Sequence, residues 1–81
     1  MKIAVRLFAA AREAAGQDLV HLTVPAPATI ATLRAALAER YPGLATWAAH
    51  SLFAIGAEYA TDATPIPEGA DVACIPPVSG G

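Results

Sequence analysis

The 81-residue sequence contains one cysteine, few basic residues and no long apolar run. Cys74 has no second cysteine with which to form an intrachain disulfide, which suits a reducing compartment. Although 56% of the residues are hydrophobic, many of these are alanine, and no stretch approaches the ~20 apolar residues of a membrane-spanning helix. The sequence begins without the basic, apolar and cleavage regions of a secretory signal, so we expect a cytoplasmic protein with no membrane segment.

Charged residues are too few and too scattered for nucleic-acid binding. The five basic residues, at positions 2, 6, 12, 34 and 40, form no stripe, and the formal net charge is −2. Nucleic-acid binding depends on clustered phosphate contacts, so we exclude that class and expect all five side chains, Arg34 included, at a solvated surface. Three carboxylates, Asp62, Glu68 and Asp71, precede the C-terminal segment. Solvated loop residues are the expected explanation, and a docking edge for a basic partner is the alternative.

Candidate metal ligands and nucleophiles form no recognisable site. His21, His50 and Cys74 are too far apart in sequence to show metal-ligand spacing. We expect His21 on the outer face of a strand, His50 in a loop and Cys74 as a small buried hydrophobe. Ser51 and Ser79 lack the neighbours of an activated nucleophile. The chain therefore shows no self-contained active site.

Apolar periodicity predicts one α+β domain. Strands are expected over residues 3–8, 19–24, 52–55, 58–60 and 72–75, and an Ala-rich turn at 9–15 joins the first two as an antiparallel hairpin. Thr29 is a good N-cap for a helix over residues 30–41, in which Ile30, Leu33 and Leu37 share one face. Residues 44–49 add another helical turn. This order predicts one main helix packed on a mixed sheet, with residues 1–75 as the domain and 76–81 as a tail.

The last six residues, Pro76–Gly81, differ in kind from the rest of the chain. Two terminal glycines arise by chance in about one chain in two hundred. Two prolines favour an extended conformation, in which six residues at ~3.1 Å each reach nearly ~20 Å. Gly80 and Gly81 lack Cβ atoms and can pass through a narrow channel. Adenylation would turn the Gly81 carboxylate into an electrophile, so this segment predicts an acyl-carrier tail.

The same segment carries a resemblance to a known family. The tail Pro76-Pro77-Val78-Ser79-Gly80-Gly81 is similar to that of the molybdopterin synthase small subunit, a member of the ubiquitin-like β-grasp superfamily. The opening Val5–Ala9, the pair Arg12-Glu13 with Gly16, and the turn at 67–72 also fit that family. Two departures are Ile55-Gly56, where the family often has an Asn-containing turn, and Cys74, where it often has an aromatic residue.

The resemblance implies a β-grasp fold and a role in molybdenum cofactor biosynthesis. An activating enzyme would adenylate Gly81 with ATP, a sulfur donor protein would convert it to a thiocarboxylate, and the chain itself would bind no cofactor. The tail would deliver sulfur to cyclic pyranopterin monophosphate in the synthase large subunit, within a heterotetramer of two large and two small subunits. Partner contacts are expected from apolar residues that flank the tail and from the tail itself: Phe8, Ile75, Pro76, Pro77, Val78, Ser79 and Gly80.

Three alternatives remain open at this point. The chain could carry sulfur for thiamine synthesis or for tRNA thiolation through the same terminal glycine. It could be a protein modifier that is joined to lysines through Gly81. It could also be a plain interaction module whose tail is incidental, and Phe8 and Ile75 could be core residues instead of docking residues.

Overall fold

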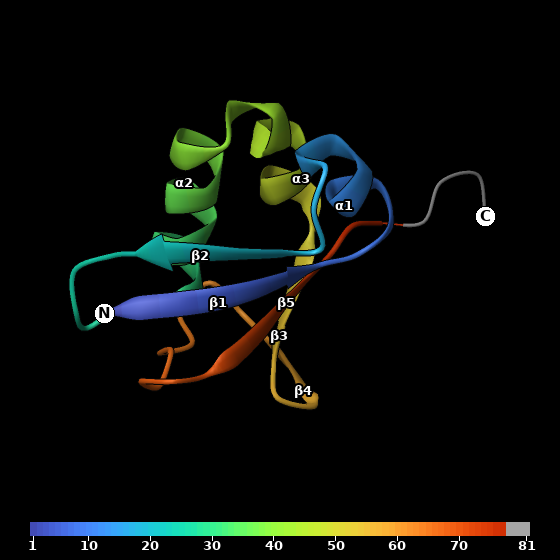
Figure 1. The fold of residues 1–81 in the computed structure, drawn as a ribbon. Helices are drawn as coiled ribbons and strands as arrows, with labels where there is room; N and C mark the ends of the chain where they lie inside the picture. The colour runs from blue at the N-terminus through green and yellow to red at the C-terminus, as the bar shows by residue number, and fades with distance from the viewer. Residues whose placement is uncertain (78–81) are drawn as a thin grey trace.

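The computed structural model describes residues 1–77, which form a five-stranded sheet with helices packed on one face (Figure 1). The strands are β1 (Lys2–Leu7), β2 (Leu19–Thr23), β3 (Leu52–Ile55), β4 (Glu58–Ala60) and β5 (Asp71–Ile75). The helices are α1 (Ala9–Ala15), α2 (Ile30–Arg40) and α3 (Ala45–His50), with a short 3-10 helix, η1 (Pro42–Leu44), before α3. No helix in this part of the chain is long and apolar enough to cross a membrane.

The sheet has the strand order β2-β1-β5-β3-β4 and is mixed. β1 and β5 run parallel, whereas β1 with β2, β3 with β5 and β3 with β4 run antiparallel. The expected hairpin of the first two strands and the mixed sheet are therefore confirmed. The connection from β2 back to β3 crosses one face of the sheet and carries α2, which is the β-grasp arrangement (Figure 1).

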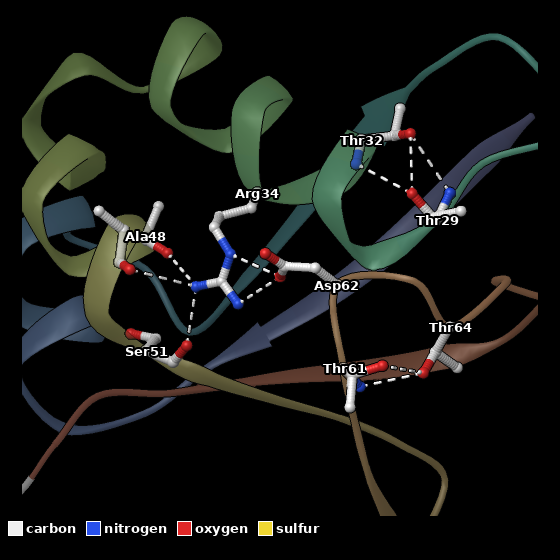
Figure 2. Close-up of polar contacts among 9 residues, drawn as sticks. Thr29, Thr32, Arg34, Ala48, Ser51, Thr61, Asp62 and Thr64 are labelled. Atoms are coloured by element: carbon white, nitrogen blue, oxygen red, sulfur yellow. Dashed lines mark hydrogen bonds and ion pairs between the residues drawn. The ribbon is translucent and has the colours of Figure 1, made fainter.

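Helix α2 begins where the sequence predicts, because Thr29 provides the cap. The Thr29 Oγ1 accepts a hydrogen bond from the backbone N–H of Thr32 at 3.4 Å, and the Thr29 N–H donates to the Thr32 Oγ1 at 3.3 Å (Figure 2). These reciprocal bonds occupy backbone donors that the first turn of a helix leaves free. Ile30, Leu33 and Leu37 are fully buried, so the predicted helix register is confirmed.

The core lies between α2 and the inner face of the sheet. Alternate strand residues point into it, including Ile3, Val5 and Leu7 of β1 and Phe53 of β3. The opposite face of the sheet carries the other half of each strand and is not covered by a helix (Figure 1). This division gives β1, β2 and β5 one buried side and one more exposed side, as the period-2 patterns predict.

The structure contains more helix than the sequence patterns suggested. The Ala-rich segment after β1 is the helix α1, which ends at Gly16 with φ of 73°, a left-handed conformation that suits glycine. The helical turn expected at 44–49 becomes η1 followed by α3. His50 was expected in a loop and is instead the last residue of α3, because its backbone continues the helix before Ser51 turns extended.

Candidate functional site

The C-terminal segment leaves the sheet from β5, which is an inner strand. β5 pairs with β1 on one side, where Leu7 lies opposite Cys74, and with β3 on the other, where Leu52 lies opposite Ile75. A strand held by ladders on both sides cannot shift its register without breaking both sets of hydrogen bonds. The direction in which the chain leaves the sheet is therefore fixed by two neighbours.

Burial changes between Pro76 and Pro77, just after β5. Cys74 is 2% exposed, Ile75 is half-buried and Pro76 is still buried, whereas Pro77 is exposed. Neither proline can donate to a sheet ladder, which explains why pairing stops at Ile75. Four of the expected site residues, Val78, Ser79, Gly80 and Gly81, lie outside the described residues.

Three apolar side chains surround this end of β5, and we call them the tail-exit patch: Phe8, Leu52 and Ile75. Phe8 is 41% exposed and lies beside β5, because its N–H donates to the Cys74 carbonyl at 3.3 Å. Leu52 is 58% exposed and lies opposite Ile75 across the β3–β5 ladder. Exposed large apolar side chains that gather at one place are typical of a protein-binding surface.

The structure brings together Phe8 and Ile75, the two docking residues expected from the sequence. Phe8 is at the surface and not in the core, and Ile75 is only half-buried. Leu52 was missed, because its position beside the tail depends on the register between β3 and β5. The apolar run at residues 52–55, which ends at Gly56, indicated a strand, but no local signal indicated its partner.

Arg34 holds together the elements around β3, and the expectation that it is a solvated surface residue is wrong. Its Nη1 donates to the carbonyl of Ala48 at 2.6 Å and to that of Ser51 at 2.9 Å, while Nε and Nη2 donate to Asp62 Oδ1 at 3.1 and 2.9 Å (Figure 2). The guanidinium also lies over the Phe53 ring, 4.8 Å from its centroid. One side chain on α2 therefore joins the end of α3, the start of β3 and the loop after β4.

Cys74 is a core residue, as expected, and not an exposed nucleophile. Burial raises the pKa of its thiol, while the Ser51 hydroxyl and the positive charge of Arg34 act in the opposite direction. The Ser51 Oγ is buried and makes no hydrogen bond of ordinary geometry within residues 1–77. A buried thiol that favours its neutral form is unsuited to sulfur chemistry.

The remaining polar residues form no second centre within residues 1–77. No group of three or more His, Cys, Asp or Glu side chains in this part of the chain could hold a metal ion. His21 is exposed on β2, as expected. Asp62 is engaged by Arg34, and Asp71 lies 4.0 Å from Arg6, so these two carboxylates of the expected acidic cluster have basic neighbours within the chain.

Comparisons with known proteins agree with this geometry. A model of the ThiS family matches residues 5–81. The molybdopterin synthase sulfur carrier subunit of Arabidopsis thaliana is 33% identical over 81 residues, which make up 100% of this chain and 84% of that protein. The crystal structure of SAMP1 from Haloferax volcanii superposes with a TM-score of 0.85 at 27% identity and full coverage of both chains.

A protein complex also contains a similar chain. One chain of the complex of subunits 1 and 2 of the molybdopterin-converting factor from Helicobacter pylori 26695 superposes with a TM-score of 0.68 at 23% identity, again with full coverage of both chains. At this identity the likeness concerns the fold. The predicted β-grasp fold is therefore confirmed.

Proposed function

The chain belongs to the ThiS family, and we propose that it is a sulfur carrier for molybdopterin synthesis that works through a thiocarboxylate on Gly81. The observation that carries this proposal is its similarity over all 81 residues to a molybdopterin synthase sulfur carrier subunit. The fold agrees with such a role, since β5 gives the C-terminal segment a fixed exit from the sheet.

The proposed chemistry has two stages. An activating enzyme joins the Gly81 carboxylate to the AMP portion of ATP and releases pyrophosphate. A persulfide on a donor protein then attacks the acyl carbon, and AMP leaves with the electron pair of the broken bond. A thiol next attacks the donor's sulfur in the resulting acyl disulfide, so that the S–S bond breaks, the thiol and the donor form a disulfide, and Gly81 keeps the outer sulfur. The product is a thiocarboxylate, whose sulfur is a nucleophile at neutral pH.

We propose that the acceptor of this sulfur is the pterin precursor bound in the synthase large subunit. The sulfur forms a bond to a pterin side-chain carbon as that carbon loses an oxygen substituent, which leaves with the electron pair of the C–O bond. Hydrolysis of the resulting thioester then leaves the sulfur on the pterin and restores the Gly81 carboxylate. Two such transfers are needed for a dithiolene. A complex of subunits 1 and 2 in the Helicobacter pylori protein supports a large subunit as partner, and the tail-exit patch is the surface that would contact it.

The short distance between the sheet and Gly81 explains why a carrier of this kind needs a fixed point at which the chain leaves the sheet. From Pro77, the last described residue, four residues remain to Gly81, and an extended chain of four spans about 12 Å. A reacting carbon at the end of so short a segment is positioned by the place where the chain leaves the sheet. The two ladders of β5 and the contact of Phe8 with Cys74 fix that place.

The test is the intact mass of the purified chain after incubation with its activating enzyme, ATP and a sulfur source. The proposal predicts a gain equal to the exchange of one oxygen for sulfur, located by fragmentation at Gly81 and absent without ATP. A chain lacking Gly81 is the matched control, and it should acquire no sulfur in the same time. An unchanged wild-type mass, with an enzyme that is active on another carrier, would contradict the proposal.

A protein modifier is the second candidate, and one observation favours it. A crystal structure of the H. volcanii small archaeal modifier protein 1 superposes on this chain with a TM-score of 0.82 at 25% identity, over 95% of this chain and 98% of that one. In that role the activated Gly81 would be joined to lysine amines of other proteins. Mass spectrometry of cells that express a tagged chain would reveal Gly81 isopeptides on target lysines. The sulfur carrier proposal requires the thiocarboxylate whether or not such isopeptides occur.

A further inference from the structure

The edge strand β2 and its neighbour α2 enclose a cleft that the proposed function does not use. Its volume is about 680 Å³. The lining combines the second half of β2 with one side of α2: His21, Leu22, Thr23, Val24, Pro25, Thr32, Ala35, Ala36, Glu39 and Arg40. Several of the α2 side chains are small, which leaves room beside the strand. β2 lies two strands away from β5, so this region is separate from the tail-exit patch (Figure 1).

Three residues of β2 direct their backbone groups away from the sheet. Just before β2, the Asp18 carbonyl accepts from Leu7, and just after it, the Val24 N–H donates to the Met1 carbonyl. Because antiparallel partners alternate, the even-numbered residues of β2 face β1, and Leu19, His21 and Thr23 face the free edge. This edge contains neither proline nor lysine, which commonly protect exposed edges.

The outer face beside this edge is basic. The outward-facing residues of β1 and β2 include Lys2, Arg6 and His21 and no carboxylate. Asp71, on β5, lies 4.0 Å from Arg6 and is the acidic neighbour on that face. In the cleft itself, Glu39 and Arg40 contribute one charge of each sign. Acidic groups of a ligand are therefore favoured more on the outer face than in the cleft.

We propose that the β2 edge and this cleft bind an extended segment of a partner protein in which apolar and acidic side chains alternate. Strand addition satisfies the outward N–H and carbonyl groups of His21 and Thr23. Side chains on one side of the added strand then enter the cleft against Ala35 and Ala36. Those on the other side lie on the same face as His21 and, one strand further, Lys2 and Arg6. The partner binds while the tail remains accessible, and this inference does not depend on the sulfur chemistry.

A second copy of the chain fits the cleft less well than a single strand. If two copies paired through β2, the inward side chains brought to the seam would be Val20 and Leu22. These are 2% and 5% exposed and already packed in their own core, so they cannot fill the neighbour's cleft. In a single added strand, the side chains that face the cleft are not packed in a core of their own and can fill it. The cleft therefore favours an extended segment over the β2 strand of a second copy, which is already covered by its own α2.

The experiment is an NMR titration of the isotopically labelled full chain with the acetylated, amidated peptide Asp-Val-Glu-Val-Asp-Val-Glu. We expect saturable shifts centred on the amides of Leu19, His21 and Thr23. The same peptide with lysine in place of each acidic residue should bind at least about tenfold more weakly at low salt, because its charges lie on the same face as those of Lys2 and Arg6 and are repelled by them. Absence of binding at millimolar peptide, or equal binding of the two peptides, would overturn the proposal.

Two variants locate the binding. Thr23→Pro removes an outward donor and leaves the β1 ladder intact, and Ala35→Leu fills the cleft from the exposed side of α2. Each should weaken the acidic peptide about tenfold or more. Ala31→Leu is the matched control, since Ala31 is exposed on α2 but does not line this cleft, and it should bind as the wild type does. Amide dispersion and thermal melts check that each variant is folded.

The location of the shifts decides between the remaining outcomes. Shifts at Phe8, Leu52 and Ile75 would place the peptide on the tail-exit patch and overturn the proposal. Shifts of the β2 amides that depend on protein concentration and not on peptide would identify a second copy as the occupant, which also overturns it. Unchanged affinity in both Thr23→Pro and Ala35→Leu would show that neither the edge nor the cleft is used.

Discussion

Leu52 of β3 lies directly opposite Ile75 of β5, at the position where the chain leaves the sheet. The relationship places an exposed leucine beside the last paired residue before the tail, with Phe8 on the other side of β5. A partner that receives the tail must therefore meet this apolar surface, and the tail-exit patch connects the fold to the proposed transfer of sulfur.

The first prediction concerns that patch. Leu52→Ser and Phe8→Ser should each weaken binding to the synthase large subunit about tenfold or more, because buried apolar anchors carry much of the energy of an interface. Both side chains are well exposed in the free chain, so the free energy of unfolding should change little. Isothermal titration and denaturant melts measure the two quantities.

The control for the patch is Tyr59→Ser. Tyr59 is 71% exposed on β4, at the far edge of the sheet, and lies opposite Ala54 instead of a β5 residue. Its replacement should leave large-subunit binding unchanged. If Leu52→Ser and Phe8→Ser lose stability while retaining binding, the two residues belong to the core and the docking assignment is wrong.

The second prediction tests the core. Leu37→Ala should lower the free energy of unfolding by roughly 2–5 kcal/mol, because this α2 side chain is fully buried in the core and its truncation leaves a cavity. Glu39→Ala, two residues further along the helix and exposed, should change it by less than about 0.5 kcal/mol. Equal effects of the two substitutions in urea melts would contradict the helix register.

The third prediction concerns Arg34. Arg34→Ala should destabilise the fold by about 2 kcal/mol or more, because the carbonyls of Ala48 and Ser51 lose their donor and the Phe53 ring loses its cation. Arg34→Lys should recover only part of this loss, since an ammonium group cannot reproduce the planar set of donors.

Asp62→Ala is the matched comparison for Arg34. Asp62 is 61% exposed, so loss of its ion pair should cost less than about 1 kcal/mol. Denaturant melts of all three variants should therefore rank Arg34→Ala as the most destabilised. A cost for Asp62→Ala that equals the cost for Arg34→Ala would assign the stability to the ion pair instead of the carbonyl bonds.

The extent to which the sequence predicted these features follows from how local each signal is. The start of α2 and its buried face depend on Thr29 and on apolar spacing within one helix, so both were predicted correctly. The role of Arg34 depends on partners that are 14, 17 and 28 residues away, and no local pattern reveals them. Leu52 was missed for the same reason, because its position follows from the pairing of two distant strands.

The fourth prediction uses the buried thiol. Burial raises the pKa of Cys74 above its usual value of 9.0, so the folded state holds this proton more tightly than the unfolded state does. Its contribution to stability is complete below pH 9.0 and is lost as the pH rises through the higher pKa of the folded thiol. The free energy of unfolding should therefore fall more steeply above pH 9.0 in the wild type than in Cys74→Ala.

Alkylation provides an independent measurement of the same group. Iodoacetamide should modify Cys74 slowly in the folded chain and rapidly in denaturant, because the thiol is 2% exposed. Modification of the native chain at the rate of a free thiol would contradict this placement and would reopen Cys74 as a reactive residue.

The central claim is that the terminal carboxyl group of Gly81 carries the sulfur. Deletion of Gly81 moves the reacting carbon back by about 3 Å, and a displacement of even ~1 Å can cost ~100-fold in rate. The deletion should leave thermal stability unchanged, because Gly81 lies six residues beyond the end of β5 and its removal breaks no ladder of the sheet. Gly80→Ala should also fold normally and transfer sulfur more slowly if the tail passes through a narrow channel.

The most direct measurement is molybdopterin formation by large subunit, activating enzyme, ATP and a sulfur source, with either the wild-type chain or the chain lacking Gly81. The account predicts formation with the wild-type chain and a loss of about 100-fold or more with the deletion, while circular dichroism shows both chains folded. Wild-type rates of molybdopterin formation from a fully folded chain without Gly81 would contradict it.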